Sequence, residues 1–226
     1  MGLRYNTKIS KDGLILYLDA ANSKSTSGPG VQWNNLVAGD VLSSTGTPSL
    51  TTLGGADCYR FTAAGQYFSS SISALSTDAP DTELTMEAWI YPETEITAGD
   101  RGNICRINAG QPAYLSWNKS NLKLSNYWYG HTPAGYHETG AAMTRNNWHH
   151  VCAVWNGSTL YQYTNMVQTS VSVTGTAAAN GSITVGHEGD SRQFAGGIAV
   201  IRVYNIALEY SEVYANYLAC RGRFGA

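Results

Sequence analysis

Residues Gln193–Gly225 decide the fold, and they read QFAGGIAVIRVYNIALEYSEVYANYLACRGRFG. A glycine pair opens the apolar run Ile198–Tyr204, which predicts a buried strand. A polar turn follows at Asn205, and apolar residues at helical spacing then predict one short helix over about Glu209–Tyr217. The remaining Arg221–Gly225 is interpreted as a basic tail. We therefore expect the C-terminal end to supply a buried strand and a helix that caps it.

Short strand patterns recur upstream, between turns rich in Gly, Pro, Asn and Ser. This spacing is typical of a two-sheet sandwich rather than of alternating strands and helices. Asn156-Gly157 is the strongest hairpin signal and predicts a type I′ turn. The expected strands are Gly13–Ala20, Asp57–Phe61, Gln66–Phe68, Leu84–Tyr91, Asn103–Asn108, Ala113–Trp117, Leu122–Tyr129, Trp148–Trp155, Thr159–Thr164, Ser182–Gly186 and Gly197–Tyr204.

The segment Leu84–Tyr91 alternates most clearly, and Pro92 ends it because proline cannot donate to a sheet. One face is expected to carry Leu84, Met86, Ala88 and Ile90, and the other Glu87, Trp89 and Tyr91.

The composition suits one large β-sandwich domain over residues 1–226, with residues 1–12 as an N-terminal extension. Hydrophobic residues make up 43%, whereas charged residues make up only 13%, about half the usual share. A net charge of -2 does not favour nucleic acid or an anionic membrane as a partner. There is no apolar run long enough to span a membrane and no apolar signal core near the N-terminus, so we expect neither a membrane span nor Sec export.

The four cysteines are Cys58, Cys105, Cys152 and Cys220, and none are spaced as zinc ligands. Cys105 and Cys152 lie within apolar strand patterns. We therefore expect small, buried, reduced side chains. The alternative is a disulfide framework, which a chain of this length does not need.

Five segments spread over nearly the whole chain carry a family resemblance. They are Leu16–Asn22, Gln32–Leu36, Leu84–Pro92, Trp148–Val154 and Ile183–Gly186. In this order they resemble laminin-G-like, or concanavalin A-like, jelly-roll domains, and Arg221–Gly225 resembles the end of such domains in virion proteins of tailed bacteriophages. The resemblance implies an all-β, two-sheet antiparallel jelly-roll sandwich with one short C-terminal helix. It says less about function, because this sandwich occurs in lectins, hydrolases and structural modules.

Two positions depart from the family pattern. Ala199 stands where the family often has an acidic residue, which argues against a calcium site there. Glu209 stands where the family favours a serine that caps the last helix. A glutamate still suits the positive end of a helix, but it caps the helix less directly.

The candidate glycan surface is the segment Asn126–Glu138, which reads NYWYGHTPAGYHE. Aromatic rings stack on the C–H faces of sugars, and neighbouring polar groups bond their hydroxyls. The candidate residues are Tyr127, Trp128, Tyr129, His131, Tyr136 and His137. If the protein binds glycans, at least two rings should lie on one open face, from Trp128, Tyr129 and Tyr136. The alternative is that these rings pack the loop against the sandwich.

The sequence supports a cation site less well than it supports the glycan surface. The loop Gly186–Arg192 could bind a sugar or calcium, although a solvated polar turn is the commoner explanation. Asp19 and Asn22 could hold a cation, but such residues more often bond nearby backbone amides. His149 and His150 should point to opposite faces, one in the core and one exposed, so a shared metal is not expected. We therefore predict no cofactor.

The motifs do not favour an enzyme. Glu93-Thr94-Glu95 lies beyond Pro92 and lacks the central aspartate of the related sandwich glucanases. The sequence has no Gly-x-Ser-x-Gly elbow and no phosphate-binding fingerprint.

The main hypothesis is therefore a carbohydrate-binding adhesin on the phage virion, assembled in the host bacterial cytoplasm, that recognises host surface polysaccharide. The alternative is a structural capsid or tail decoration protein that contacts other virion proteins without binding glycan, and a depolymerase ranks third. The sequence leaves a homo-oligomeric state open. Fibre proteins are often trimers, but this sequence has no coiled-coil heptads.

Overall fold

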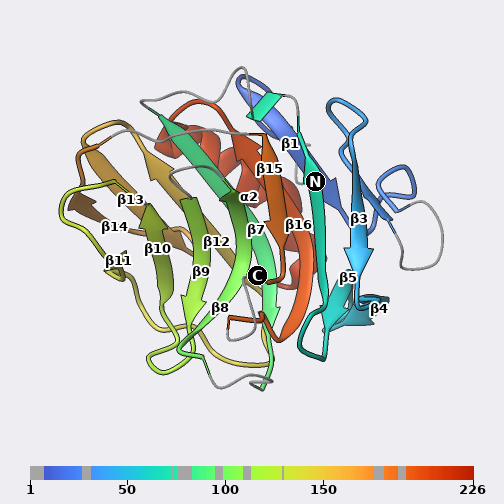
Figure 1. The fold of residues 1–226 in the computed structure, drawn as a ribbon. Coiled ribbons are helices and arrows are strands. Elements are labelled where there is room, and N and C mark those ends of the chain that lie inside the picture. Colours follow the sequence, from blue (N-terminus) through green and yellow to red (C-terminus); the bar gives the residue numbers. More distant parts are fainter. Residues whose placement is uncertain are drawn as a thin grey trace, which may run out of the picture.

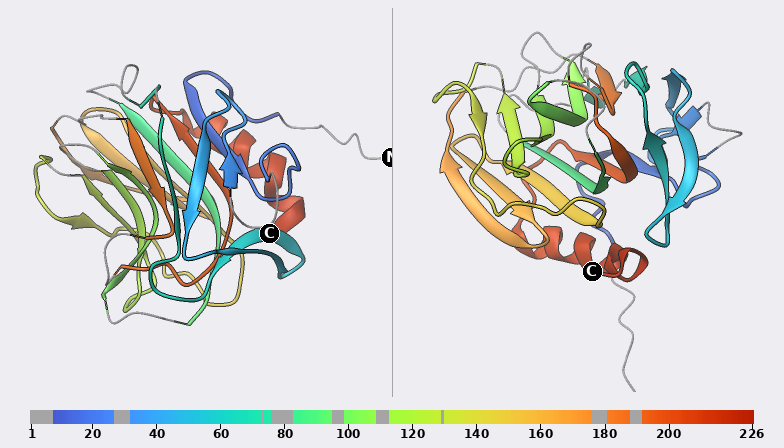
Figure 2. Two further views of the ribbon diagram at one scale, coloured as in Figure 1. Left: turned by 45° about the vertical axis from the view of Figure 1, so that its right-hand side comes forward. Right: turned by 90° about the horizontal axis from the view of Figure 1, so that it is seen from below.

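The computed structural model describes residues 8–26, 32–72, 74–75, 83–94, 99–108, 113–128, 130–175, 181–187 and 192–226. Two antiparallel eight-stranded sheets pack face to face, and helix α2 lies behind one of them (Figures 1 and 2). The predicted all-β sandwich with one C-terminal helix is thus confirmed. Among the described residues, no helix is long and apolar enough to span a membrane.

We call the sheet next to α2 the helix-side sheet. Its order is β14-β13-β12-β7-β16-β5-β4, with β1 also paired to β16. Its strands are β1 (Leu14–Asp19), β4 (Ser49–Leu53), β5 (Ala56–Phe61), β7 (Leu84–Pro92), β12 (His149–Trp155), β13 (Thr159–Thr164), β14 (Val167–Ser172) and β16 (Gly196–Tyr204).

We call the other sheet, nearest the viewer in Figure 1, the front sheet. Its order is β11-β10-β9-β8-β15-β6-β3-β2. Its strands are β2 (Gln32–Asn34), β3 (Val41–Thr45), β6 (Tyr67–Ser71), β8 (Arg101–Asn108), β9 (Ala113–Asn118), β10 (Leu124–Trp128), β11 (Tyr136–His137) and β15 (Ser182–Val185).

The main core fills the space between the sheets. Strand β7 contributes the four apolar residues predicted for one face, Leu84, Met86, Ala88 and Ile90, all of them buried there. On its opposite face Trp89 is buried as well, because α2 covers it. Strand β7 is therefore buried on both sides, between the front sheet and the helix.

Helix α2 spans Tyr210–Phe224, so it continues seven residues beyond the predicted end at Tyr217. The expectation of a basic tail after the helix was wrong. Phe224 stacks on Trp89 with ring centroids 4.2 Å apart, and Arg223 Nη1 lies 2.7 Å from Asp19 Oδ1. These long-range contacts hold the last turn in helical form despite Gly222, a residue that disfavours helix interiors.

A buried charged cluster fastens α2 to the helix-side sheet. Glu87 Oε1 lies 2.7 Å from Arg202 Nη1 and 3.0 Å from His150 Nε2, and Glu87 Oε2 accepts a hydrogen bond from Asn216 at 2.8 Å. All four residues have 0% exposure. Burial raises the pKa of Glu87, but Arg202 and His150 outweigh it and hold that pKa below its ordinary value.

The predicted exposure of one histidine in the His149–His150 pair was wrong. His150 is covered by α2, and the His149 ring is enclosed by Thr144 and Asn165, so both are buried. Burial also lowers the pKa of His149. The error arose because the outer face of this strand is covered rather than solvated.

The β12–β13 hairpin forms at Asn156-Gly157 as predicted, but not as a type I′ turn. Only Gly157 has positive φ, at 87°, and the Asn156 side chain accepts the Thr159 amide at 2.9 Å. Two consecutive positive φ values occur instead at Asn165 (49°) and Met166 (67°), between β13 and β14.

The four cysteines are free. Cys58, Cys105 and Cys152 are buried, as predicted, and Cys220 is partly exposed. Burial raises the pKa of the Cys58 thiol to about 12.

Candidate functional site

Strand pairing aligns outward-facing residues in one line across the front sheet. Side chains alternate along each strand, and chain neighbours such as Leu115, Ile107 and Ile183 belong to the main core. From β11 to β3 the line consists of Tyr136, Tyr127, Tyr114, Arg106, Thr184, Ser69 and Ser43, which we call the cross-strand row. Because neighbouring strands lie about 4.8 Å apart, the row extends for roughly 30 Å. No described helix lies on this face.

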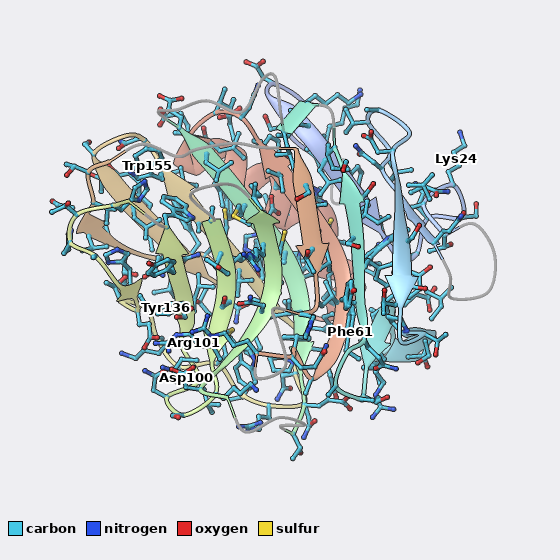
Figure 3. All side chains as sticks on the ribbon, viewed as in Figure 1. Lys24, Phe61, Asp100, Arg101, Tyr136 and Trp155 are labelled. Atoms are coloured by element: carbon cyan, nitrogen blue, oxygen red, sulfur yellow. The ribbon has the colours of Figure 1, made fainter. Side chains whose placement is uncertain are left out.

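The three tyrosines at one end of the row form a cluster. The rings of Tyr136 and Tyr127 have centroids 5.0 Å apart, and those of Tyr127 and Tyr114 are 5.7 Å apart. Tyr127 and Tyr136 are partly exposed, whereas Tyr114 is 5% exposed. The Arg101 guanidinium lies 3.7 Å above the Tyr136 ring, and Figure 3 shows the two side by side. The cluster therefore offers partly open rings bordered by a cation.

A carboxylate network holds Arg101 in place. Glu138 Oε1 lies 2.7 Å from Arg101 Nη2. Glu138 also accepts hydrogen bonds from three neighbours, Asn118, Asn121 and Ser125. Burial raises the pKa of Glu138, but these bonds outweigh it and bring that pKa below its ordinary value. Glu138 is thus a charged, fully bonded group that positions Arg101 over the tyrosine cluster.

A second aromatic pair lies near the other end of the row. Tyr67 of β6 stacks on His187, with ring centroids 5.1 Å apart and planes 16° apart. Tyr67, Tyr114 and Arg101 were absent from the predicted site, since they belong to distant segments. Their outward positions in the alternating strands were the only available signal.

The expectation that Trp128 is exposed was wrong. Trp128 is 3% exposed and packs edge-on against Trp155 in the core, at 5.4 Å between ring centroids. Strand β10 continues to Trp128, and alternation turns this side chain inward while Tyr127 faces out. The alternative explanation, that a ring packs the segment against the sandwich, is therefore correct for Trp128. Tyr129 lies outside the described residues.

His131 and His137 are also buried, at 3% and 8% exposure. The His131 ring lies 4.4 Å from the Trp155 ring and 5.2 Å from the Trp128 ring, and neither of its nitrogens has a hydrogen-bond partner among the described residues. Burial, together with the nearby His137, lowers the pKa of His131 to about 4. Neither histidine faces the outer surface. Of the predicted glycan residues that the structure describes, Tyr127 and Tyr136 are the ones on that face.

The side-chain oxygens of the candidate cation ligands Asp19 and Asn22 accept hydrogen bonds from nearby backbone amides. Asp19 Oδ1 accepts the Ala21 amide at 3.0 Å, and Asn22 Oδ1 accepts the Lys24 amide at 3.0 Å. This confirms the predicted backbone role of both residues. Of the loop at 186–192, the structure describes Gly186, His187 and Arg192, so its acidic residues lie outside the described part. No cluster of three metal-ligating side chains occurs among the described residues.

Residues 62–214, more than half of the chain, match the family described as the Concanavalin A-like lectin/glucanases superfamily. The chain belongs to this superfamily. A comparison with curated protein sequences finds no match. The family assignment agrees with the two-sheet fold and with the resemblance carried by the five sequence segments.

Solved structures share the fold at low identity. Domain 4 of an extracellular arabinanase from Geobacillus stearothermophilus, in complex with arabinotriose, has 17% identity and a TM-score of 0.63, over 93% of this chain and 100% of that one. A Trypanosoma rangeli sialidase in complex with 2,3-difluorosialic acid has 13% identity and a TM-score of 0.64, over 95% of this chain and 34% of that one. The botulinum neurotoxin serotype G binding domain has 12% identity and a TM-score of 0.66, over 90% and 50%. The chain thus spans about a third of the sialidase and half of the toxin domain.

Proposed function

We propose that this protein is a carbohydrate-binding module whose glycan lies on the front sheet, along the cross-strand row. The tyrosine cluster is the observation that carries the proposal. It presents partly exposed rings at the end of a line of arginine, threonine and serine side chains. Rings that stack on sugars, next to groups that bond hydroxyls, are what a glycan site requires. The arabinotriose complex of domain 4 of the arabinanase is consistent with this use of the fold.

We further propose a non-catalytic adhesin of a tailed-phage virion, acting on host surface polysaccharide. The virion context rests on the sequence resemblance to phage-borne domains. Two carboxylates among the described residues support the absence of catalysis, since Glu138 is fully bonded and Glu93 forms a bidentate pair with Arg60. A glycosidase needs one carboxyl free to donate a proton.

A second candidate function is a structural virion protein that binds no glycan. The burial of Trp128 favours it, because this ring was the strongest sugar-stacking candidate in the sequence. On this alternative the outer tyrosines would contact other virion subunits.

The deciding experiment measures binding of the wild type, Tyr127→Ala and Tyr136→Ala to an immobilised glycan array and to polysaccharide purified from host cells. Tyr214→Ala is the matched control, since Tyr214 is 41% exposed but lies on α2. We expect each front-sheet variant to bind about 5–30-fold more weakly, which corresponds to about 1–2 kcal/mol. Binding unchanged in both variants, or absent in the wild type, would favour the structural alternative.

A further inference from the structure

A concave site lies on the side of the molecule opposite the cross-strand row, where α2 begins beside β12, β13 and β14. It has a volume of about 220 Å³. The residues that matter to its chemistry are Asn156, Tyr161, Tyr163, Gln168, Glu209 and Tyr210. We call it the helix-start pocket. Its volume is below the roughly 300–1,000 Å³ of pockets for drug-sized ligands, so it suits a single ring.

One hydroxyl in this pocket is left unbonded. The Tyr163 side chain is 2% exposed, and its hydroxyl makes no hydrogen bond to a described residue. The centroid of its ring lies 6.2 Å from that of Tyr210. Other buried tyrosine hydroxyls of this sheet are bonded, that of Tyr59 to the Gln32 carbonyl at 2.9 Å and that of Tyr204 to Asn216 at 2.9 Å. This hydroxyl is not one of the fully enclosed polar atoms that lack a partner, so part of it reaches the pocket, where a ligand hydroxyl can replace water as its partner.

The rest of the lining matches a polyhydroxylated ring. Tyr210 is 50% exposed, so one side of its ring can receive the C–H face of a sugar. Asn156 and Gln168 are exposed at the rim. The Asn156 oxygen already accepts local bonds, so its NH2 group can donate to a ligand, whereas the Gln168 amide can donate and accept. Together these groups combine a stacking ring with several polar contacts.

Charge narrows the class of ligand. Of the residues that line the pocket, Glu209 carries a charge, and that charge is negative. Two more carboxylates adjoin it: Glu212 Oε2 accepts the Glu209 amide at 3.0 Å, and Glu83 Oε2 accepts the Ala207 amide at 3.2 Å. A carboxylated sugar would be repelled by these three groups. We propose that the helix-start pocket binds one neutral sugar residue, as a site separate from the cross-strand row.

The test is an NMR titration of the full chain with methyl glucoside, methyl galactoside and N-acetylglucosamine. Glucuronate serves as the carboxylated counterpart of glucose. We expect at least one neutral sugar to shift the backbone amides of Asn156, Tyr163 and Tyr210, with a dissociation constant on the order of 1 mM. Glucuronate should bind at least about fivefold more weakly at neutral pH, and Glu209→Gln should narrow that gap.

Tyr163→Phe removes the unbonded hydroxyl and keeps the ring, so the variant should fold with an unchanged melting temperature. We expect it to lose about fivefold or more in affinity for the neutral sugar. Asn147→Ala, at an exposed position outside the pocket, should bind like the wild type. Three results would each overturn the proposal: no shift of the pocket amides, equal binding by Tyr163→Phe, or equal binding of glucuronate. Shifts confined to the front sheet would also overturn it, while leaving the proposed function intact.

Discussion

The two outer faces of the sandwich both carry outward-pointing aromatic and charged side chains, but these are buried on one face and partly exposed on the other. On the helix-side sheet, Trp89 and Glu87 point away from the main core, yet α2 covers both and their exposure is 0%. On the front sheet, Tyr127 and Tyr136 also point away from the core, but they remain partly exposed and no described helix covers them. An outward aromatic or charged residue is therefore a surface feature only where nothing packs on it.

The difference also separates stability from recognition. Glu87 and Trp89 are engaged in attaching α2, through Asn216 and Phe224 respectively. The tyrosine cluster is held by its own strands and by Arg101, so its exposed edges are available to a ligand. Substitutions on the helix side or in the core should change the free energy of unfolding, whereas substitutions on the front face should change binding.

The largest effect is expected for Trp128→Ala. This ring is buried between the sheets against Trp155, so truncation should lower the free energy of unfolding by about 3–5 kcal/mol. Chemical denaturation followed by fluorescence would measure it. A change below about 1 kcal/mol would mean that the Trp128 ring is not packed as described.

Acid should lower the free energy of unfolding through His131, whose ring lies beside that of Trp128. Burial, with the nearby His137, lowers the pKa of His131 to about 4 in the folded protein, from the ordinary 6.5 of the unfolded chain, so the unfolded state takes up the proton first as the pH falls. The contribution of His131 is present above pH 6.5 and is lost as the pH falls to about 4, by up to about 3 kcal/mol.

Urea denaturation of the wild type and His131→Phe between pH 7 and 4 would test this. The variant should lose less stability on acidification, although His137, whose pKa is also lowered by burial, retains part of the effect. Identical slopes in the two proteins would contradict the assignment to His131.

A smaller loss is expected from Asn216→Ala on the helix side. Asn216 donates to Glu87 and to the Tyr204 hydroxyl, and its own oxygen accepts the Ser10 amide. Removal leaves these buried partners less well bonded, at a cost of about 1–3 kcal/mol. Asn147→Ala, at an exposed position, is the matched control and should cost less than about 0.5 kcal/mol. Equal losses in the two variants would show that the cluster does not fasten α2.

Much of the fold could be predicted from local patterns. Alternation identified Leu84–Tyr91 and its inner face, and the Asn156-Gly157 hairpin was found, because these signals depend on neighbouring residues. Strands β3, β4 and β14 were missed, since they are rich in serine and threonine and largely exposed. The end of α2 was missed because Phe224 is held by Trp89, 135 positions earlier in the chain.

The candidate site could be predicted only in part, for the same reason. The aromatic composition located the segment that contains Tyr127 and Tyr136. Which of its rings point inward depends on the alternation of side chains along β10, and this alternation turns Trp128 toward the core. Tyr114 and Arg101 join the cluster through strand pairing, which no local pattern indicates. One histidine of the pair His149–His150 was expected to be exposed, because the helix that covers His150 could not be placed from sequence.

A loss of stability smaller than that of Asn216→Ala is expected for Tyr127→Ala, and it forms the sharpest contrast with Trp128→Ala. The two residues are adjacent on β10, but Tyr127 faces out and keeps part of its ring in solvent. Its truncation removes contacts with the rings of Tyr114 and Tyr136 but opens no cavity between the sheets. We expect a loss of about 0.5–1 kcal/mol, the usual worth of an aromatic pair at a surface. The same denaturation assay would place the two variants on one scale. A loss at Tyr127 as large as that at Trp128 would mean that the front face is a structural layer, and the distinction between a covered and an available face would fail.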